Sequence, residues 1–367
     1  MDDPFWLRTE RLDLRRPTPA YLDDYVRLHT DPRTYAHSPA GMPDASRCAE
    51  RLDGDVVDWA RDGLGYAAVI DRVSGEVIGW AGLRRKDTEP LAANLYYRLA
   101  HDRIGGGLGR ELARALVSWA AEHEPDLTVT AMVDHANAVS ARTAEGAGLR
   151  GAGTRQHADH APGSSPMLYF VAPTVRVVSA SEVDRDASGA GGDVTGSLVA
   201  AMLDLWVRVN DAGGSVGFLP GAARDAVSSA LEHHLDQVRS GRSRLCVLQD
   251  PDPHPDAALR GFAFCDHHLG FPHEHVAVLG RLMVDPDARG RNLGRILLSG
   301  LVGTARRELP HVELLRLDYR GGQGLGSFYR RAGWTEVGRI PDGLLLSQTD
   351  RRDDVTMVRR VDGRPLR

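Results

Sequence analysis

Two glycine-rich segments of this sequence have residue types that suit the binding of a phosphate group. In segment 281–304, a short apolar run is followed by Asp285-Pro286-Asp287, a glycine turn and apolar residues at helical spacing. The first turn of a helix has unpaired backbone N–H groups and about half a positive charge from the helix dipole. A glycine turn that leads directly into a helix is therefore a potential anion site. The residues expected to form it are Leu282, Met283, Val284, Arg289, Gly290, Arg291, Asn292, Leu293, Gly294 and Arg295.

A second segment of the same kind lies earlier in the chain, at 97–123. It again has an apolar run, a breaker, a glycine turn and a helical pattern. A solvated glycine turn is the simpler interpretation of one such segment, but two similar units in one chain indicate an internal duplication and favour anion binding. The residues of this turn are Ile104, Gly105, Gly106, Gly107, Leu108, Gly109 and Arg110.

Two other phosphate-binding patterns fit these segments poorly. A dinucleotide-binding fingerprint begins with Gly105 and Gly107, but its third glycine is missing and the later segment does not repeat it. A nucleotidase P-loop requires Gly-Lys followed by Ser or Thr, and neither turn has this sequence.

Both segments resemble the pyrophosphate-binding motif of the GNAT superfamily of acetyl-CoA-dependent N-acetyltransferases. That motif reads Arg or Gln, two residues, Gly, one residue, then Gly or Ala. In the later segment Arg289, Asn292 and Gly294 take the three positions, with Asn in place of the usual glycine. Asn adopts positive φ more readily than other non-glycine residues, so this replacement is mild. In the earlier segment the glycines fit, and Ile104 takes the leading position.

The N-terminal half resembles the RimJ/RimL-like branch of the superfamily. Its opening at 7–25, LRTERLDLRRPTPAYLDDY, is typical of that branch, and so is a large apolar residue at Ile104. Asn137 and Ser140 match the Asn-x-x-Ser segment of the family. The resemblance implies that Asn137 orients the pantetheine amides and that Ser140 donates to the departing thiolate. An N-cap asparagine followed by a serine in the first helical turn is an equally open explanation.

The C-terminal half resembles the tabtoxin-resistance-like branch between residues 198 and 343. A strand ending Leu317-Asp318 precedes Gly-Trp at 333–334 and Gly-x-Ile-Pro at 338–341. Tyr329 falls on the tyrosine that many GNAT enzymes use as a general acid toward the coenzyme A sulfur. The alternative is an aromatic residue of the core.

The general base is the component that the sequence supplies least clearly. Many relatives carry an acid on the strand before the glycine turn, but Val276 and Val278 take those positions in the later segment and Asn94 in the earlier one. His275 precedes the later strand, and an imidazole titrates near neutral pH. His275 is therefore the candidate base. A histidine-rich surface turn at 273–275 is the alternative explanation.

Around both turns the sequence predicts mixed α/β domains with a central sheet, and the resemblance implies two GNAT domains in tandem. The predicted strands are 66–71, 77–84, 92–99, 127–134, 244–249, 260–267 and 276–284, and the predicted helices are 20–30, 44–61, 198–209 and 223–238. We place the boundary at Ala172-Pro173, which gives domains 1–172 and 173–367. A segment near 184–196 is rich in Ala, Gly, Ser and Asp and is predicted to be a flexible insertion.

The composition narrows the class of protein. With 367 residues, each half is long enough to bury a core, and a net charge of -5 disfavours nucleic acid as a partner. The 3 cysteines are far apart and no metal-ligand cluster is evident, so we expect a reducing compartment and no metal. No apolar run approaches about 18 residues and no signal segment is evident. We therefore expect a cytoplasmic protein without a membrane partner.

The GNAT resemblance implies a transferase that uses acetyl-CoA as co-substrate and acetylates a primary amine. We expect the C-terminal half to be catalytic, because it combines the arginine-rich turn with Tyr329. The expected acceptor is a small molecule such as an antibiotic, toxin or metabolite, with a protein N-terminus second. The alternative is an acyl-CoA-binding regulatory or scaffold protein with one or both domains catalytically silent. We expect a monomer with two pseudo-dimeric domains or a homodimer.

Overall fold

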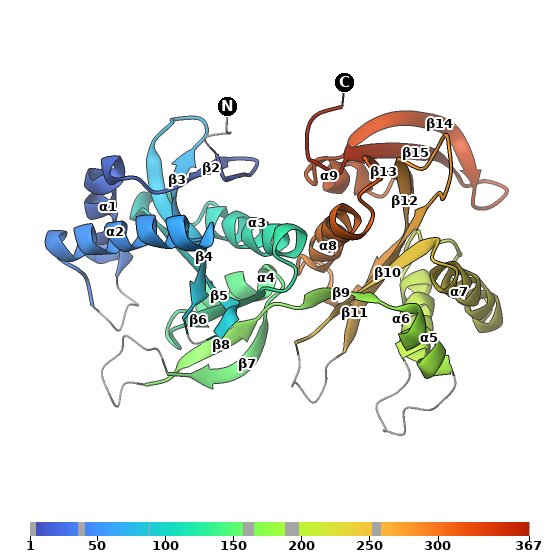
Figure 1. Cartoon of the computed structure of the whole chain (residues 1–367), viewed down its shortest axis with the longest axis horizontal. Coiled ribbons are helices and arrows are strands. Elements are labelled where there is room, and N and C mark those ends of the chain that lie inside the picture. The colour runs from blue at the N-terminus through green and yellow to red at the C-terminus, as the bar shows by residue number, and fades with distance from the viewer. Residues whose placement is uncertain are drawn as a thin grey trace. The chain divides into compact units, whose positions relative to one another are not determined.

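The computed structural model describes residues 5–35, 41–87, 89–156, 165–187, 198–251 and 258–366. The chain forms two compact units. The first comprises Met1–Ala120 and Asp126–Pro173, and the second comprises Ala121–Pro125 and Thr174–Arg367. Each unit has its own sheet with helices packed against it (Figure 1).

The first unit is built on a mixed sheet. Within the described residues its strand order is β1-β2-β3-β4-β5-β6-β8-β7. The strands are β1 Leu7–Arg8, β2 Leu12–Arg15, β3 Tyr66–Asp71, β4 Val77–Lys86, β5 Glu89–Leu99, β6 Thr128–Val133, β7 Arg150–Arg155 and β8 Met167–Val171. The helices are α1 Leu22–His29, α2 Ala45–Asp62, α3 Leu108–His123 and α4 Ala138–Gly146, with 3-10 turns at Pro19–Tyr21, Pro32–Thr34 and His101–Arg103.

Helix α2 shows how the local sequence determines an element of this unit. Asp44 precedes the helix, and its side chain accepts the Arg47 N–H at 2.8 Å as an N-cap. The helix ends at Gly63, whose φ of 63° is a conformation that residues with a side chain rarely adopt. Leu52 and Trp59 recur on its buried face. The helix therefore packs one apolar face against the sheet.

The second unit has a mixed sheet whose described strands follow the order β14-β15-β13-β12-β11-β10-β9. They are β9 Thr174–Val178, β10 Ser243–Gln249, β11 Leu259–His267, β12 Val276–Val284, β13 Leu314–Arg320, β14 Thr335–Leu345 and β15 Arg351–Arg360. The helices are α5 Ala180–Ala187, α6 Leu198–Asp211, α7 Arg224–Arg239, α8 Leu293–Glu308 and α9 Leu325–Arg330, with a 3-10 turn, η4, at Pro286–Ala288.

The structure confirms the predicted strands and helices, which differ from the observed elements only at their ends. Strands β14 and β15 were not predicted. The predicted insertion near 184–196 begins inside α5, and its remainder from residue 188 lies outside the described residues.

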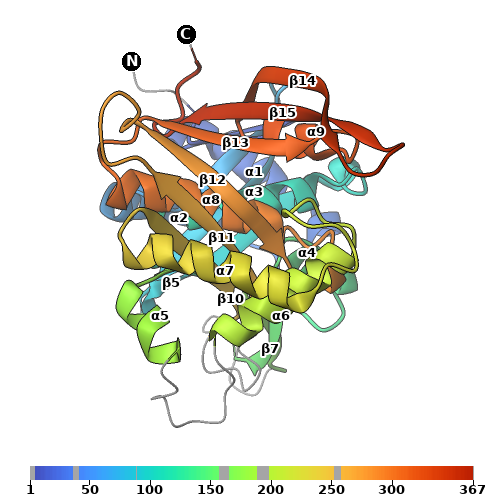
Figure 2. The ribbon, with the colours of Figure 1, turned by 90° about the vertical axis from the view of Figure 1, so that its right-hand side faces the viewer.

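Helices cover both faces of the second sheet. Figure 2 shows α6 and α7 in front of β10–β12 and α8 behind these strands. The core on the α6 and α7 side contains Trp206, Leu231, Phe262 and Phe264. Because side chains alternate along a strand, Asp266 follows Phe262 and Phe264 on the same face of β11. A carboxylate therefore lies at the end of an apolar row.

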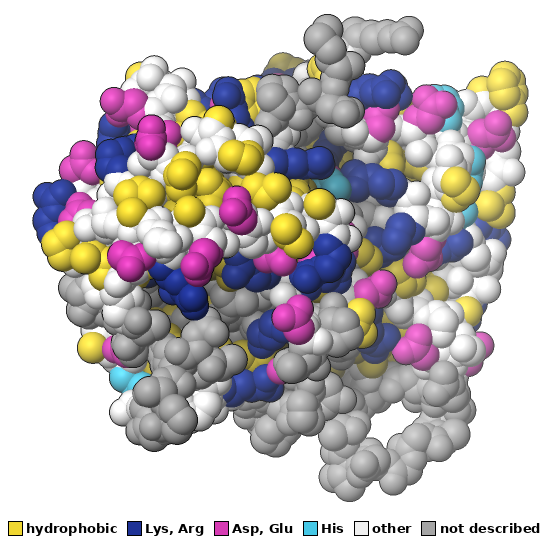
Figure 3. Space-filling view, turned by 60° about the vertical axis from the view of Figure 1, so that its left-hand side comes forward, with side chains coloured by type: hydrophobic (Ala, Val, Ile, Leu, Met, Phe, Trp, Pro, Cys, Tyr) yellow, Lys and Arg dark blue, Asp and Glu magenta, His cyan; other side chains and the backbone are white. Residues whose placement is uncertain are grey.

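The surface carries charges of both signs. Figure 3 shows Lys and Arg side chains next to Asp and Glu side chains over the face in view, and on α2 Arg47 lies 3.1 Å from Glu50. No helix in the described part of the chain is long and apolar enough to cross a membrane. The three cysteines are buried and free of disulfides. Among the described residues, no group of three or more His, Cys, Asp or Glu side chains could hold a metal ion.

Candidate functional site

The parallel strands β12 and β13 separate part-way along their length. They are paired only where Val276–Val278 face Leu314–Arg316. Strand β12 continues to Val284 and β13 to Arg320, so their carboxyl halves diverge. One edge of β12 is therefore open to another molecule from Leu279 onward, and its backbone groups can pair with a ligand.

A β-bulge distorts β12 beside this divergence. Phe264 is opposite Gly280 and Phe262 is opposite Met283, so two residues of β12, Arg281 and Leu282, face a single residue of β11. Arg281 adopts a φ of 54°, which is rare for a residue with a side chain. Bulges of this kind change the direction of local N–H groups and are frequent next to active sites.

Beyond β12, the chain makes the predicted turn into α8. The 3-10 turn η4 is followed by Arg289, Gly290, Arg291 and Asn292, and α8 begins at Leu293. Gly290 and Asn292 have φ values of 79° and 64°, so Asn292 adopts the conformation for which the motif normally uses glycine. A Cβ placed on Gly290 would meet no atom within 4 Å. A glycine turn with this conformation at the N-terminus of a helix is the arrangement that suits an anion.

The first unit repeats the divergence and the turn but lacks the bulge. Strands β5 and β6 are paired only where Ala92–Asn94 face Thr128–Thr130. Gly105 and Gly107 have φ values of 95° and 78°, and α3 begins at Leu108. However, β4 and β5 pair without a register shift between the point where Arg85 faces Ala93 and the point where Gly79 faces Leu99. Strand β5 therefore has no bulge at the place that corresponds to Arg281.

Sequence comparison identifies the family to which this repeated geometry belongs. Residues 11–150 match the profile of the acetyltransferase (GNAT) domain, and residues 231–334 match that of the acetyltransferase (GNAT) family. The chain belongs to the GNAT acetyltransferases. It holds two GNAT domains in tandem, and the family is one of acyltransferases. No curated protein matches the chain in sequence.

Solved structures of single GNAT proteins align with about one half of this chain. An acetyltransferase from Agrobacterium tumefaciens is 28% identical, with 47% of this chain and 95% of that protein covered and a TM-score of 0.39. A GNAT-family acetyltransferase from Bordetella pertussis is 22% identical, covers 45% and 98%, and has a TM-score of 0.39. The ribosomal-protein acetyltransferase RimL, solved in complex with coenzyme A, is 15% identical, covers 44% and 94%, and has a TM-score of 0.38.

The three arginines of the second GNAT turn have different surroundings. Arg289 donates from Nη2 to the carbonyl oxygen of Ala212 at 3.0 Å, so the loop after α6 holds its guanidinium. Arg291 is exposed. Burial, with a smaller effect of the nearby Arg359, lowers the pKa of Arg295 to about 10. Arg295 thus remains a cation at neutral pH in a poorly solvated position, where a bound anion would stabilise it.

The structure packs α9, the helix that carries Tyr329, against the start of α8. Phe328, the neighbour of Tyr329, lies 3.6 Å from a Cβ placed on Gly294, so α9 packs against the second residue of α8. The Tyr329 ring lies 5.5 Å from that of Tyr319, and only 8% of Tyr329 is exposed. Burial, helped by Tyr319, raises the pKa of Tyr329 to about 12. Tyr329 is therefore a neutral hydrogen-bond donor at physiological pH.

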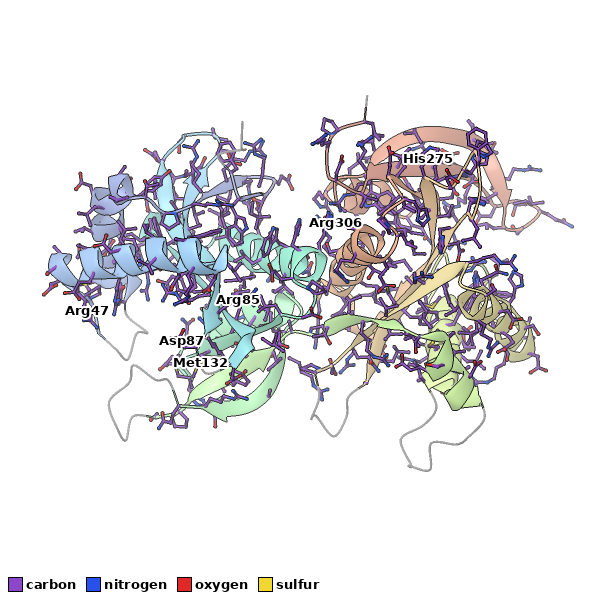
Figure 4. The ribbon with its side chains drawn as sticks, in the orientation of Figure 1. Arg47, Arg85, Asp87, Met132, His275 and Arg306 are labelled. Atoms are coloured by element: carbon purple, nitrogen blue, oxygen red, sulfur yellow. The ribbon has the colours of Figure 1, made fainter. Side chains whose placement is uncertain are left out.

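The structure does not bring His275 to this site. His275 precedes β12, and its carbonyl oxygen accepts the N–H groups of Glu313 and Leu314 at 2.9 and 3.1 Å (Figure 4). Arg281 at the bulge lies six residues further along the strand. At about 3.3 Å per residue, this spacing corresponds to about 20 Å. His275 lies at the opposite end of β12 from the glycine turn.

In the first GNAT domain, Asn137 and Ser140 lie at the start of α4. The Asn137 side chain accepts the Ser140 N–H at 3.0 Å, which is the N-cap arrangement. The hydroxyl of Tyr97 donates to Ser140 Oγ at 3.3 Å, and the Tyr97 ring lies 3.0 Å from a Cβ placed on Gly109. Tyr97 thus links the glycine turn to Ser140, a role that the sequence analysis missed. At the position of the missing base, Asn94 donates to the Tyr66 hydroxyl at 3.0 Å.

A group of polar residues missed from the sequence lies on the α6 and α7 face of the second sheet. Arg281 donates from Nε to His234 Nε2 at 3.2 Å, and His234 stacks on Phe264 with ring centroids 4.7 Å apart. Burial and the charge of Arg281 lower the pKa of His234. Asp266 Oδ1 is buried and has no hydrogen-bond partner. The available sequence signal was an acid two residues beyond Phe264 in an apolar strand.

The loop between α6 and α7 spans the divergent strands. The Ser215 hydroxyl donates to Gln323 Oε1 at 2.7 Å, and Gln323 Nε2 donates to the Gly213 carbonyl at 3.2 Å. A Cβ on Gly217 would lie 2.5 Å from Arg281 Nη1, so this loop lies directly on the guanidinium of the bulge. The loop therefore contacts both β12 and the turn that follows β13.

Proposed function

We propose that the C-terminal GNAT domain transfers an acetyl group from acetyl-CoA to a primary amine of a small molecule. The observation that carries this proposal is the bulge at Arg281, located where β12 diverges from β13. The first domain has the divergence without a bulge at the corresponding place in β5. A bulge supplies redirected N–H groups, and acyl transfer requires such donors for the developing oxyanion.

The residues of this domain fit acetyl-CoA, which supplies the activated thioester. The glycine turn at Gly290 and the N-terminus of α8 suit its pyrophosphate, and Arg289 and Arg295 add positive charge. The open edge of β12 beyond Val278 suits an amide-bearing pantetheine chain. The backbone N–H groups of Leu282, in the bulge, and of Met283 and Val284 are the proposed donors to the thioester carbonyl.

Tyr329 has a limited role in this mechanism. A thiol has a pKa of about 8.5, whereas the buried Tyr329 has a pKa of about 12. Complete proton transfer from the phenol to the thiolate is therefore uphill. Tyr329 instead stabilises the departing sulfur by donating a hydrogen bond, and solvent can complete its protonation.

Removing a proton from the acceptor amine costs more free energy than protonating the thiolate. An alkylammonium with a pKa of about 10.4 must lose a proton before it can attack, at a free-energy cost of about 4.6 kcal/mol at pH 7. Binding the amine beside the thioester offsets part of the barrier by proximity. A group that accepts the proton is still needed.

The N-terminal domain is proposed as a second coenzyme A site. A Cβ placed on Gly105 or Gly106 would meet no atom within 4 Å, as is also true of Gly290. Ser140, held beside Tyr97, is the group that can donate to a thiolate there. This domain is either a second active site or a silent acyl-CoA-binding scaffold, and counting bound ligands and turnover separates these possibilities.

Native mass spectrometry with excess acetyl-CoA tests the proposal. Gly106 and Gly294 do not require positive φ, so Gly106→Trp and Gly294→Trp can block one turn each, and the exposed Gly54→Trp on α2 is the control. We expect two ligands for the wild type and the control, and one for each turn variant. In a panel of primary amines, Gly294→Trp should abolish acetylation and Gly54→Trp should retain it. Acetyl-CoA binding without acetylation of any amine would contradict the catalytic proposal.

A further inference from the structure

Asp266, on β11, lies beside the point at which β12 and β13 separate. It pairs in register with Val278, which is the last residue of β12 that is also paired with β13. Adjacent strands lie about 4.8 Å apart, so the Asp266 backbone is one strand away from the point at which the gap opens. Its Oδ2 lies 3.9 Å from a Cβ placed on Gly280, the residue before Arg281. The carboxylate is thus directed toward the bulge.

The hydrogen bonding of Asp266 is incomplete. Oδ1 is buried and has no partner within the described structure. A buried carboxylate oxygen without a donor is unfavourable. A donor supplied by a bound molecule would remove this penalty. The group best suited to a carboxylate at the end of an apolar row is an ammonium.

The neighbouring side chains leave Asp266 as the available proton acceptor. Arg281 directs its Nε–H to His234 Nε2 and not to the carboxylate, so the histidine lone pair is already used. Arg281 also lies over the ring of Trp206 at 5.6 Å, which holds its guanidinium on this face. Burial keeps His234 neutral at pH 7 by lowering its pKa. The strand position opposite Asp266, where an acid was expected, is Val278.

We propose that Asp266 is a catalytic residue of the C-terminal domain and that its carboxylate binds the ammonium of the acceptor and takes its proton. This inference rests on the proposed acetyl transfer. The nitrogen loses two protons in all. Asp266 takes one and passes it to solvent, and the other reaches the thiolate. The C–N bond forms as the C–S bond breaks, so an ammonium and acetyl-CoA give an N-acetyl amine, coenzyme A and one released proton.

The charge of Arg281 restricts the acceptor. The guanidinium of Arg281 interacts electrostatically with Asp266. The carboxylate offsets the repulsion between this guanidinium and one ammonium, whereas a second cation close to the reacting amine would be repelled. Monoamines and amines with a nearby anionic group should therefore react better than polyamines. The panel should include n-butylamine, an amino acid and spermidine.

The kinetic test compares Asp266→Asn with Asp225→Asn, which changes an exposed carboxylate in the first turn of α7. Release of coenzyme A in the presence of each amine gives kcat, and acetyl-CoA binding by calorimetry reports an intact fold. We expect kcat to fall by about 100-fold or more in Asp266→Asn, with acetyl-CoA affinity unchanged, which is the range for loss of a general base. An Asp266→Asn enzyme within threefold of the wild type would overturn the proposal.

A second measurement tests the ammonium site without relying on turnover. If the wild type acetylates no amine, the proposed acetyl transfer is refuted, but the ammonium site can still be tested. Carboxyl ¹³C signals of the full chain, with Asp266 assigned by its loss in Asp266→Asn, are recorded at one fixed pH with and without n-butylammonium. The titratable and charged groups around Asp266 are His234 on α7, Arg281 on β12, and Cys265 and His267 on β11. Bound ammonium should shift the Asp266 carboxyl signal and leave the Asp225 signal unchanged. An Asp266 signal indifferent to the amine would refute the ammonium site.

Discussion

The protonation states of single residues in the candidate site indicate which of them can donate a hydrogen bond, accept one or carry a charge. Burial raises the pKa of Tyr329 to about 12 and lowers that of His234. Both side chains are therefore neutral at pH 7, the first as a hydrogen-bond donor and the second as an acceptor for Arg281. In the proposed mechanism, the charges that act on an acceptor are those of Asp266 and Arg281. The sequence alone could identify these residue types, but it could not show which of them share a face.

Replacement of Tyr329 by phenylalanine should lower kcat modestly and without dependence on pH. Because the pKa of Tyr329 is about 12, the phenol stays protonated between pH 6 and about 9. Loss of one hydrogen bond to the sulfur corresponds to about 1–2 kcal/mol, or roughly 5- to 30-fold in kcat. The measurement is kcat for both proteins across this pH range. A ratio that falls above pH 8 would mean that Tyr329 titrates there and that its role is different.

Gly217 should be required for the Arg281–His234 contact. Gly217 has a φ of 106°, and a Cβ there would lie 2.5 Å from Arg281 Nη1. Gly217→Ala should therefore displace the guanidinium and raise the pKa of His234, because Arg281 contributes to lowering it. NMR titration of the imidazole measures this change. Gly221→Ala is the matched control, since Gly221 has a φ of 78° but open space around it. An equal effect of both variants on His234 would contradict the contact.

At the scale of elements, the glycine turn of the first domain depends on the strands at the N-terminus. Arg11 donates from Nη1 to the Gly106 carbonyl at 2.9 Å. Glu111, in the first turn of α3, accepts from the Thr9 hydroxyl at 2.6 Å and from Arg11 N and Nε at 2.9 and 2.6 Å. The segment between β1 and β2 therefore fixes both the turn and the start of the helix.

Glu111→Gln should destabilise the first domain in a manner that depends on pH. Burial opposes ionisation of Glu111, but the bonds from Thr9 and Arg11 outweigh it and lower its pKa. Since the pKa is lower in the folded state, the stabilisation is complete above the unfolded value of about 4.3 and is lost as the pH falls through the folded value. We expect a loss of about 1–2 kcal/mol at pH 7 in urea unfolding, because a charge-assisted bond is lost. A difference that persisted unchanged in acid would contradict this account.

Elements also show how far the sequence could predict the structure. The strand, turn and helix at 276–308 follow from local patterns, because glycine, proline and apolar spacing act within a few residues. The bulge at Arg281 depends on register with β11, and so does the position of Asp266 opposite Val278. Such register is set by long-range pairing that a local pattern does not contain. Strand β14 was missed because Gly338, Pro341 and Gly343 interrupt its pattern.

For the whole molecule, the two GNAT domains share a turn and a divergence but differ in their chemical groups. The second has a bulge, a buried tyrosine and an unpartnered carboxylate oxygen. The first has no bulge at the corresponding place in β5, and Asn94, at the position where a base was expected, is hydrogen-bonded to Tyr66. This difference is consistent with a duplication in which binding is retained in both halves and catalysis in one.

Hydrogen exchange can test whether both halves bind the same ligand. A ligand at 100 times its Kd stabilises the state that binds it by about 2.7 kcal/mol. Hydrogen exchange that requires release of the ligand is therefore slowed by about 100-fold. With acetyl-CoA, we expect slower exchange at 104–109 and at 289–294, the two glycine turns. In Gly294→Trp only the first turn should remain protected, whereas Gly54→Trp should match the wild type. Protection confined to 289–294 in the wild type would mean that the N-terminal domain has kept the GNAT fold and lost the ligand.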